Sequence, residues 1–291
     1  MVSKIQEACG ASMRTGFDWA QIEPDPPISG VHTYHWDNFD RIVNSTTSKN
    51  IDIIALIVTT PLWASDNSDP DNVHLYPPNN AHRADYIAFL TALVNRYQGK
   101  VKYYEFWNEA NGCGWHPGCG GDKQAKAQEY LPWQKVTYDT IKNIDSSLSV
   151  STTGMDGADA DFLTRLYNLS STVTCAGHFC WDAVNTHPYN PNGPINFNGL
   201  DALHSLMHTN NDNSPVWITE YGWNMSDDTT KASYLRQTLE RLNTPNYSYI
   251  PIATYLVIAD TPQTGEYGLL RDNLTPKSSS FNTFKSLACG E

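Results

Sequence analysis

Strand-like and helix-like stretches alternate along almost the whole of this 291-residue chain, and the alternation limits the folds that it can adopt. The strand-like stretches are rich in β-branched and aromatic residues, and residues 51–61 have the composition of a strand buried on both faces. We expect strands at residues 13–19, 51–61, 148–153, 183–189, 215–223 and 250–260, and one more at the start of 101–112. We expect helices at residues 3–10, 36–48, 83–97, 125–144, 160–169, 200–208, 230–242 and 280–288. This order predicts an α/β fold with a parallel sheet covered by helices.

Seven strands and eight helices are one strand short of a (β/α)8 TIM barrel. The alternative is a doubly wound open sheet, but no glycine-rich fingerprint follows an early strand, so we expect no nucleotide and no other cofactor. A capping box of Ser3 and Gln6 starts the first helix almost at once and leaves no room for a strand before it. We therefore expect one barrel domain over residues 1–291 whose first strand is missing, with unpaired edges on the strands at 13–19 and 250–260.

Two of the strand-like stretches end on a glutamate where the strand opens into a loop. Residues 101–112, VKYYEFWNEANG, carry Glu109, and residues 215–223, PVWITEYGW, carry Glu220. A carboxylate in this position is held by the strand and reached through the loop, which is a common catalytic arrangement. The carboxyl ends of barrel strands meet on one face, so the sequence predicts a two-carboxylate site. Glu105, on the same strand as Glu109, is interpreted as structural.

Other polar and aromatic residues also lie at or near the expected strand ends. They are Arg14, Trp19, Trp63, His187, Tyr189, Trp223 and Asp260. His187 is expected to form hydrogen bonds and not to bind a metal, because no second histidine or carboxylate lies at ligand spacing from it. The tryptophans are either core residues or flat platforms for sugar rings, and both readings stay open for Trp19, Trp63, Trp115 and Trp223.

Composition narrows the possible partners. The formal charge of −12 argues against nucleic acid and anionic membranes. Nine tryptophans and sixteen tyrosines, with only 17% charged residues, suit a protein that handles neutral, hydroxyl-rich ligands. No apolar run is long enough for a membrane span, and residues 1–10 lack the apolar stretch of a signal peptide. We expect a monomer.

The six cysteines indicate an oxidising compartment. Cys113 with Cys119, and Cys175 with Cys180, bracket two short loops, as disulfides often do in secreted or periplasmic proteins. Zinc is the alternative, because each loop contains a histidine, His116 or His178, but the spacings fit zinc knuckles poorly. The first and last helices are neighbours in a closed barrel, so the remaining two cysteines are expected to pair as Cys9–Cys289.

The two glutamate segments carry a resemblance to a known group of enzymes. Trp107-Asn108-Glu109 on the fourth barrel strand, with Glu220 ending the seventh, resembles the clan of retaining β-glycosidases built on (β/α)8 barrels. Family 39 of the glycoside hydrolases is most similar, through MRTGFDWAQIEP around Arg14, PLWA around Trp63, and GLL followed by Pro276-Lys277. The resemblance, which covers nearly the whole chain, implies a retaining hydrolysis of β-glycosides.

The resemblance also implies roles for single residues. Glu109 corresponds to the general acid/base, Glu220 to the nucleophile, and Asn108 to the residue that holds the sugar 2-hydroxyl. Tyr189 is expected to keep Glu220 ionised through a hydrogen bond, and Arg14 through its charge.

Two departures from the family pattern concern the substrate. The clan usually has a tryptophan near the end of the eighth strand, below the reacting sugar, where Tyr255 is the nearest counterpart here. About thirty residues remain after the last strand, too few for the family's extra β-sandwich. This shortness resembles the endo-acting exopolysaccharide hydrolases of the family. The alternative function is a carbohydrate-binding barrel without catalysis.

Overall fold

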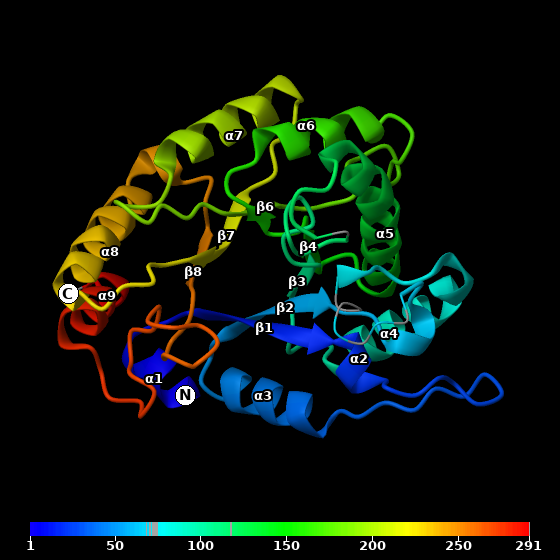
Figure 1. Cartoon of the computed structure of the whole chain (residues 1–291), viewed down its shortest axis with the longest axis horizontal. Helices are drawn as coiled ribbons and strands as arrows, with labels where there is room; N and C mark the ends of the chain where they lie inside the picture. Colours follow the sequence, from blue (N-terminus) through cyan, green and yellow to red (C-terminus); the bar gives the residue numbers. More distant parts are fainter. Residues whose placement is uncertain (68, 70, 72–74, 117, 291) are drawn as a thin grey trace.

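The computed structural model describes the whole chain except residues 68, 70, 72–74, 117 and 291. Its strands are β1 (Ser12–Asp18), β2 (Asp52–Val58), β3 (Tyr103–Phe106), β4 (Ser149–Ser151), β5 (Met155–Asp156), β6 (Val184–His187), β7 (Val216–Tyr221) and β8 (Ile252–Tyr255). Its α-helices are α1 (Val2–Glu7), α2 (Trp19–Ile22), α3 (Asp37–Thr47), α4 (Arg83–Arg96), α5 (Lys123–Ile144), α6 (Ala160–Leu169), α7 (Phe197–Thr209), α8 (Asp228–Leu242) and α9 (Ser278–Cys289). Strands and helices alternate as predicted, and Figure 1 shows the helices outside the strands.

The strands form two all-parallel sheets, in the orders β1-β2-β3-β4 and β5-β6-β7-β8. The register of β1 against β2 runs without a break from Ser12↔Asp52 to Asp18↔Val58. β4 and β5 follow one another directly and occupy a single position in the barrel, where an isolated parallel bridge joins Ser151 to Ala183 of the β6 side. The eight strands therefore fill the seven positions that the sequence predicts.

The barrel is not closed between β8 and β1. No ladder joins these two strands in the described part of the chain. A cavity of about 660 Å³ opens there, lined by residues of α1, β1, β8 and α9 and reaching Arg14 and Glu220. Both chain ends lie on this side of the molecule in Figure 1. The expected unpaired edges of the first and last strands are thus present.

One local expectation at the start of the chain is wrong. Ser3 and Gln6 do not form a capping box, because α1 already begins at Val2 with Met1 as its N-cap and without a side-chain cap. The backbone amides of Lys4 and Ile5 bond to the carbonyl of Met1, so the helix starts before Ser3. Side-chain caps do begin the later helices α5, α6, α7 and α8, from Asp122, Asp159, Asn196 and Asp227.

The three expected disulfides are confirmed. Cys9 bonds to Cys289, Cys113 to Cys119 and Cys175 to Cys180. The zinc alternative is therefore wrong, since none of the cysteines is free. His116 instead stacks on Tyr76, with ring centroids 4.4 Å apart, and its Nε2 lies 2.6 Å from Glu129.

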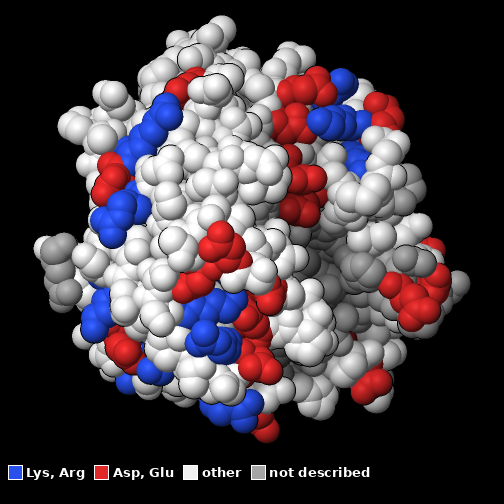
Figure 2. Space-filling view, turned by 60° about the vertical axis from the view of Figure 1, so that its left-hand side comes forward, with Lys and Arg blue, Asp and Glu red and all other residues white. Residues whose placement is uncertain are grey.

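A continuous core of aromatic and aliphatic side chains fills the space between the sheet and the helices. Charged side chains of both signs are spread over the face drawn in Figure 2, with large uncharged areas between them and acidic side chains beside a hollow. No helix among the described residues is long and apolar enough to cross a membrane.

Candidate active site

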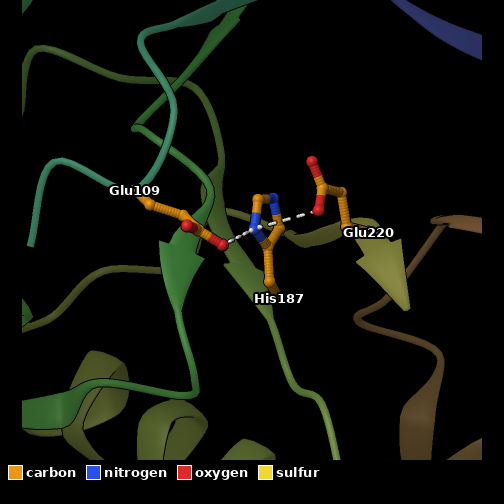
Figure 3. A group of neighbouring side chains, drawn as sticks. All are labelled: Glu109, His187 and Glu220. Carbon is orange, nitrogen blue, oxygen red and sulfur yellow. Dashed lines mark hydrogen bonds and ion pairs between the residues drawn. The ribbon is translucent and has the colours of Figure 1, made fainter. Parts of the chain in front are cut away.

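Glu109 and Glu220 lie on opposite sides of His187 (Figure 3). The His187 Nδ1 atom lies 3.0 Å from Glu109 Oε1 and 3.7 Å from Glu220 Oε2. One oxygen of each carboxylate and one ring nitrogen all lie within 4.8 Å of one another. The side chain of His187 is fully buried, whereas those of Glu109 and Glu220 are 23% and 15% exposed. The two carboxylates are therefore accessible to a ligand, while the imidazole between them is not.

Glu109 stands on a sharply turned segment after β3. Trp107 and Glu109 have φ angles of 66° and 49°, in the left-handed region that non-glycine residues rarely adopt. The turn is held by Trp107 Nε1, which donates to the Gly114 carbonyl at 2.6 Å, and by the Glu109 amide, which donates to the Gly154 carbonyl at 3.1 Å. Strain of this kind persists where the surrounding structure imposes it, and it often marks functional sites.

Gly154 makes the close approach of β5, β6 and β3 possible. A Cβ atom at this position would lie 2.1 Å from His187 Nε2 and 2.8 Å from Glu105 Oε1. Real Cβ atoms do not come this close to other heavy atoms, so a larger residue would displace His187. Glycine at position 154 is therefore part of the geometry of the site.

Glu220, near the end of β7, is surrounded by groups that favour its ionised form. Tyr189 Oη donates to Oε2 at 2.8 Å, and Arg14 Nη1 forms an ion pair with Oε1. Burial raises the pKa of Glu220, but His187, Arg14 and Tyr189 together outweigh it and hold that pKa below its ordinary value. The carboxyl group of Glu220 is thus kept as an anion.

Glu105 has a part in the site that the sequence analysis missed. Its buried carboxylate pairs with Arg14 through two hydrogen bonds, at 2.7 and 2.8 Å, and accepts the Gly154 amide at 3.0 Å. Arg14 Nη2 also donates to Asn108 Oδ1 at 2.8 Å. Glu105 therefore fixes the guanidinium that contacts Glu220. The even offset between Glu105 and Glu109 was the available signal, although β3 ends at Phe106 and Glu109 lies beyond it.

The hydrogen bonds around His187 define where its protons lie. Thr219 donates its hydroxyl hydrogen to Asn185 Oδ1 at 3.0 Å, so it can only accept from His187 Nε2, 3.1 Å away. Nε2 then carries a hydrogen. The 3.0 Å contact between Nδ1 and Glu109 Oε1 requires one further proton, on either the imidazole or the carboxyl group. One proton is therefore shared between His187 Nδ1 and the carboxyl group of Glu109 in this contact.

Glu109, His187 and Glu220 together could ligate a cation, which the spacing argument from the sequence did not foresee. Spacing along the chain could not show this group, because its members come from β6, β7 and the segment after β3. However, Glu220 already pairs with Arg14, and a divalent ion at this point would lie close to a guanidinium. The donor set therefore suits a cation poorly.

Two tryptophans that were possible sugar platforms are core residues. Trp19 is fully buried and stacks on Phe89, and its Nε1 donates to Glu23. Trp223 is 1% exposed and donates to the carbonyls of Asn190 and Gly193. The platform interpretation is wrong for both, because their faces are covered by other side chains.

The remaining candidate aromatics differ in their access to a ligand. Trp115, another possible platform, is also fully buried, in the loop closed by Cys113–Cys119. Trp63 stays partly exposed and packs edge-on against Trp19. The Tyr255 hydroxyl donates to the carbonyl of Tyr267 at 2.8 Å, so Tyr255 supports a neighbouring loop.

Tyr267 is a second residue that the sequence analysis missed. Its ring lies edge-on to Tyr189, with centroids 6.1 Å apart, and remains partly exposed. Burial raises the pKa of the Tyr267 hydroxyl, as do the charges of Glu220 and Glu109. Tyr267 directly precedes the Gly268-Leu269-Leu270 stretch, in a loop after β8, and no local pattern marked it.

Comparison with known proteins identifies the fold class. No family model matches the chain, and no curated protein matches it. A family 39 glycoside hydrolase from Bacteroides cellulosilyticus WH2 is 22% identical with a TM-score of 0.79, over 99% of this chain and 59% of that one. A family 39 β-xylosidase from Caulobacter crescentus is 20% identical with a TM-score of 0.75, over 99% and 66%. The family 39 enzyme from Xanthomonas axonopodis pv. citri is 20% identical with a TM-score of 0.74, over 99% and 62%.

The fold is therefore that of the α/β barrels found in these glycosidases. The chain spans 59% to 66% of the length of these three solved structures.

Proposed function

We propose that the chain is a retaining β-glycoside hydrolase of the family 39 type, with Glu109 as general acid/base and Glu220 as nucleophile. The observation that carries the proposal is the short separation of the two carboxylates, whose nearest oxygens lie within 4.8 Å. Retaining enzymes need carboxyl groups about 5 Å apart, whereas inverting enzymes leave roughly 6.5–9.5 Å for a water molecule. The names of the similar structures, which include β-xylosidases, support the same class.

The reaction gives the two glutamates different tasks. Glu220, kept ionised, attacks the anomeric carbon and forms a glycosyl ester while the bond to the leaving oxygen breaks. The proton held between Glu109 and His187 passes to that oxygen. Glu109 then takes a proton from water, which attacks the anomeric carbon and releases Glu220. Each step balances without a cofactor.

Neighbouring side chains have supporting roles in the proposal. Arg14 and Tyr189 stabilise the anionic form of Glu220, and Asn108, oriented by Arg14, binds the sugar 2-hydroxyl. Trp63 contributes an aromatic face at the rim. The substrate is a β-linked poly- or oligosaccharide cleaved within the chain, by a monomer that works outside the cell or in the periplasm, where its three disulfides are stable.

Chemical rescue tests the roles of the two glutamates. On a substrate with a good leaving group, Glu220→Ala with added azide should give the α-glycosyl azide, and Glu109→Ala with azide should give the β-glycosyl azide. Wild-type protein should release β-configured product first, as seen by NMR. An α-configured first product, or full activity of Glu220→Ala, would contradict the proposal. Wild-type activity on a panel of polysaccharides, followed by the size of the products, distinguishes endo from exo cleavage.

The alternative, a carbohydrate-binding barrel without catalysis, predicts a different outcome. Such a protein would bind an oligosaccharide equally well with glutamate or glutamine at position 220 and would release no reducing ends. The close pair of carboxylates favours catalysis, because retaining hydrolysis requires two carboxyl groups at this separation.

We also propose that the open interval between β8 and β1 accommodates one further parallel strand. The cavity there is bordered by the free edges of both strands. Addition of a β-rich segment of about ten residues before Met1 should raise the melting temperature, and a proline-rich segment of equal length is the control. Equal melting temperatures for both would contradict this part of the proposal.

A further inference from the structure

Two lysines are buried near the carboxyl end of β8 without any role in the proposed chemistry. Lys231, on α8, is fully buried, and Lys277, just before α9, is 8% exposed. Burial, and then the charge of Lys277, lower the pKa of Lys231 to about 8. The salt bridge of Lys277 to Asp260, at 2.7 Å, compensates part of the electrostatic cost. Two neighbouring buried ammonium groups are unfavourable unless opposite charges and hydrogen-bond acceptors compensate them.

Both ammonium groups bind the backbone of one short segment, residues 266–268. Lys231 Nζ donates to the carbonyl of Glu266 and, at 3.4 Å, to that of Gly268. Lys277 Nζ donates to the carbonyl of Glu266 at 3.3 Å. The lysines thus bind this segment through the carbonyls of the two residues that flank Tyr267.

Other polar contacts hold the same segment from different directions. The Glu266 amide donates to Asn224 Oδ1 at 2.9 Å, and the Gly268 amide donates to Asp260 Oδ1 at 2.8 Å. The hydroxyl of Tyr255 donates to the Tyr267 carbonyl at 2.8 Å. A loop fixed at each of three successive residues presents its side chain in one orientation.

The side chain presented in this way is Tyr267. Its ring lies against the turn after β7, where a Cβ on Gly222 would be 3.2 Å from Tyr267 Cδ1. It is also edge-on to Tyr189, the donor to Glu220. The hydroxyl of Tyr267 forms no hydrogen bond to any residue that the structure describes. A partly exposed aromatic ring with an available hydroxyl therefore borders the carboxylate pair.

We propose that Tyr267 forms a wall of the subsite that binds the reacting sugar, and that Lys231 and Lys277 are positioning residues that hold this wall in place. The inference rests on the proposed glycosidase function and extends it to the recognition of the substrate. The flat face of the ring suits the C–H face of a neutral pyranose, and the hydroxyl binds a sugar hydroxyl. An anionic sugar is disfavoured, because Glu220 and Glu109 lie next to the ring.

Kinetics of Tyr267 variants test the first half of the proposal. On a substrate that the wild type cleaves, Tyr267→Ala should lower kcat/KM roughly 10- to 100-fold, and Tyr267→Phe about 3- to 10-fold through loss of one hydrogen bond. Tyr138→Phe, which removes a hydroxyl bound to Asp182 on the outside of the barrel, is the matched control and should be unchanged. Tyr267→Ala within twofold of the wild type overturns the subsite. A wild type without glycosidase activity overturns instead the proposed function.

A double-mutant cycle tests the second half. Lys277→Met should raise KM in the wild-type background but have little further effect in the Tyr267→Ala background, because it acts through the tyrosine. Lys277→Arg should restore most of the loss. An equal factor in both backgrounds would show that Lys277 supports only the general fold. If Lys277→Met fails to fold, the same cycle with Asn224→Ala, which removes the contact to Glu266, decides the question.

Discussion

The parallel sheet of this barrel is interrupted at two places, between β4 and β5 and between β8 and β1. Side chains fill the first interruption but not the second. Between β4 and β5 the strand hydrogen bonds are replaced by side chains. The Thr153 amide donates to Tyr130 Oη at 2.6 Å, and the Gly154 amide donates to Glu105 at 3.0 Å. Between β8 and β1 the edges are instead separated by a cavity of about 660 Å³.

The two interruptions differ in whether the freed backbone groups find side-chain partners. At the β4–β5 interruption the Gly154 amide orients Glu105, and through it Arg14 and Glu220, so each of these groups gains a partner. At the β8–β1 interruption two strand edges remain open, and a disulfide joins the helices beside them. The interruption between β4 and β5 thus positions residues of the site, whereas the open side between β8 and β1 is spanned by a covalent link.

The largest expected effect concerns that link. Cys9→Ser with Cys289→Ser removes a crosslink between residues 280 positions apart, and the chain-entropy model predicts a loss of about 5.6 kcal/mol of unfolding free energy. Cys175→Ser with Cys180→Ser, which opens a loop of separation 5, is the matched control and should lose about 2 kcal/mol in the same model. Denaturant unfolding measures both values. Equal losses would mean that the open side of the barrel does not depend on its crosslink.

The next effect concerns the interruption at the site. Gly154→Ala should reduce kcat/KM by about 10²-fold or more, because the added methyl group would displace His187 by roughly an ångström. Gly16→Ala is the control at the other interruption, on β1, where the nearest heavy atom to an added Cβ is 3.9 Å away. This control should keep wild-type activity. Comparable losses in both variants would remove the distinction between the two interruptions.

The smallest effect concerns Glu220, which borders the cavity and also belongs to the site. Tyr189→Phe removes a hydrogen bond to the ionised carboxylate, so the pKa of Glu220 should rise. Glu220 must be ionised to act, and the acid limb of the kcat/KM profile should therefore move to higher pH, with about a tenfold loss below neutrality. Tyr138→Phe should leave the limb in place. An unshifted limb in Tyr189→Phe would assign the ionisation of Glu220 to Arg14 and His187 alone.

The order of elements and the two strand-end glutamates could be predicted from the sequence, because both depend on local composition and periodicity. The open interval was also foreseen, since seven strand patterns were counted. The roles of the tryptophans could not be predicted. Trp19 and Trp223 lie near the active face, yet their burial depends on Phe89 and on carbonyls of distant loops.

Long-range pairing also limited what the sequence revealed about the site. Glu105 and Arg14 are 91 residues apart, and no local pattern connects them. Tyr267 gains its position from lysines on two other elements. The arginine partner of Glu105 was visible only after folding. Residues that act through another side chain are thus the ones most easily missed.

The bond between Cys9 and Cys289 turns nearly the whole polypeptide into a covalent ring. One proteolytic cut in any loop between these residues would leave a single molecule, heavier only by the water of hydrolysis, until the bond is reduced. A force that pulls on the two termini is carried by the sulfur atoms and the few residues outside them. The sheet, with its open side, then bears none of that load.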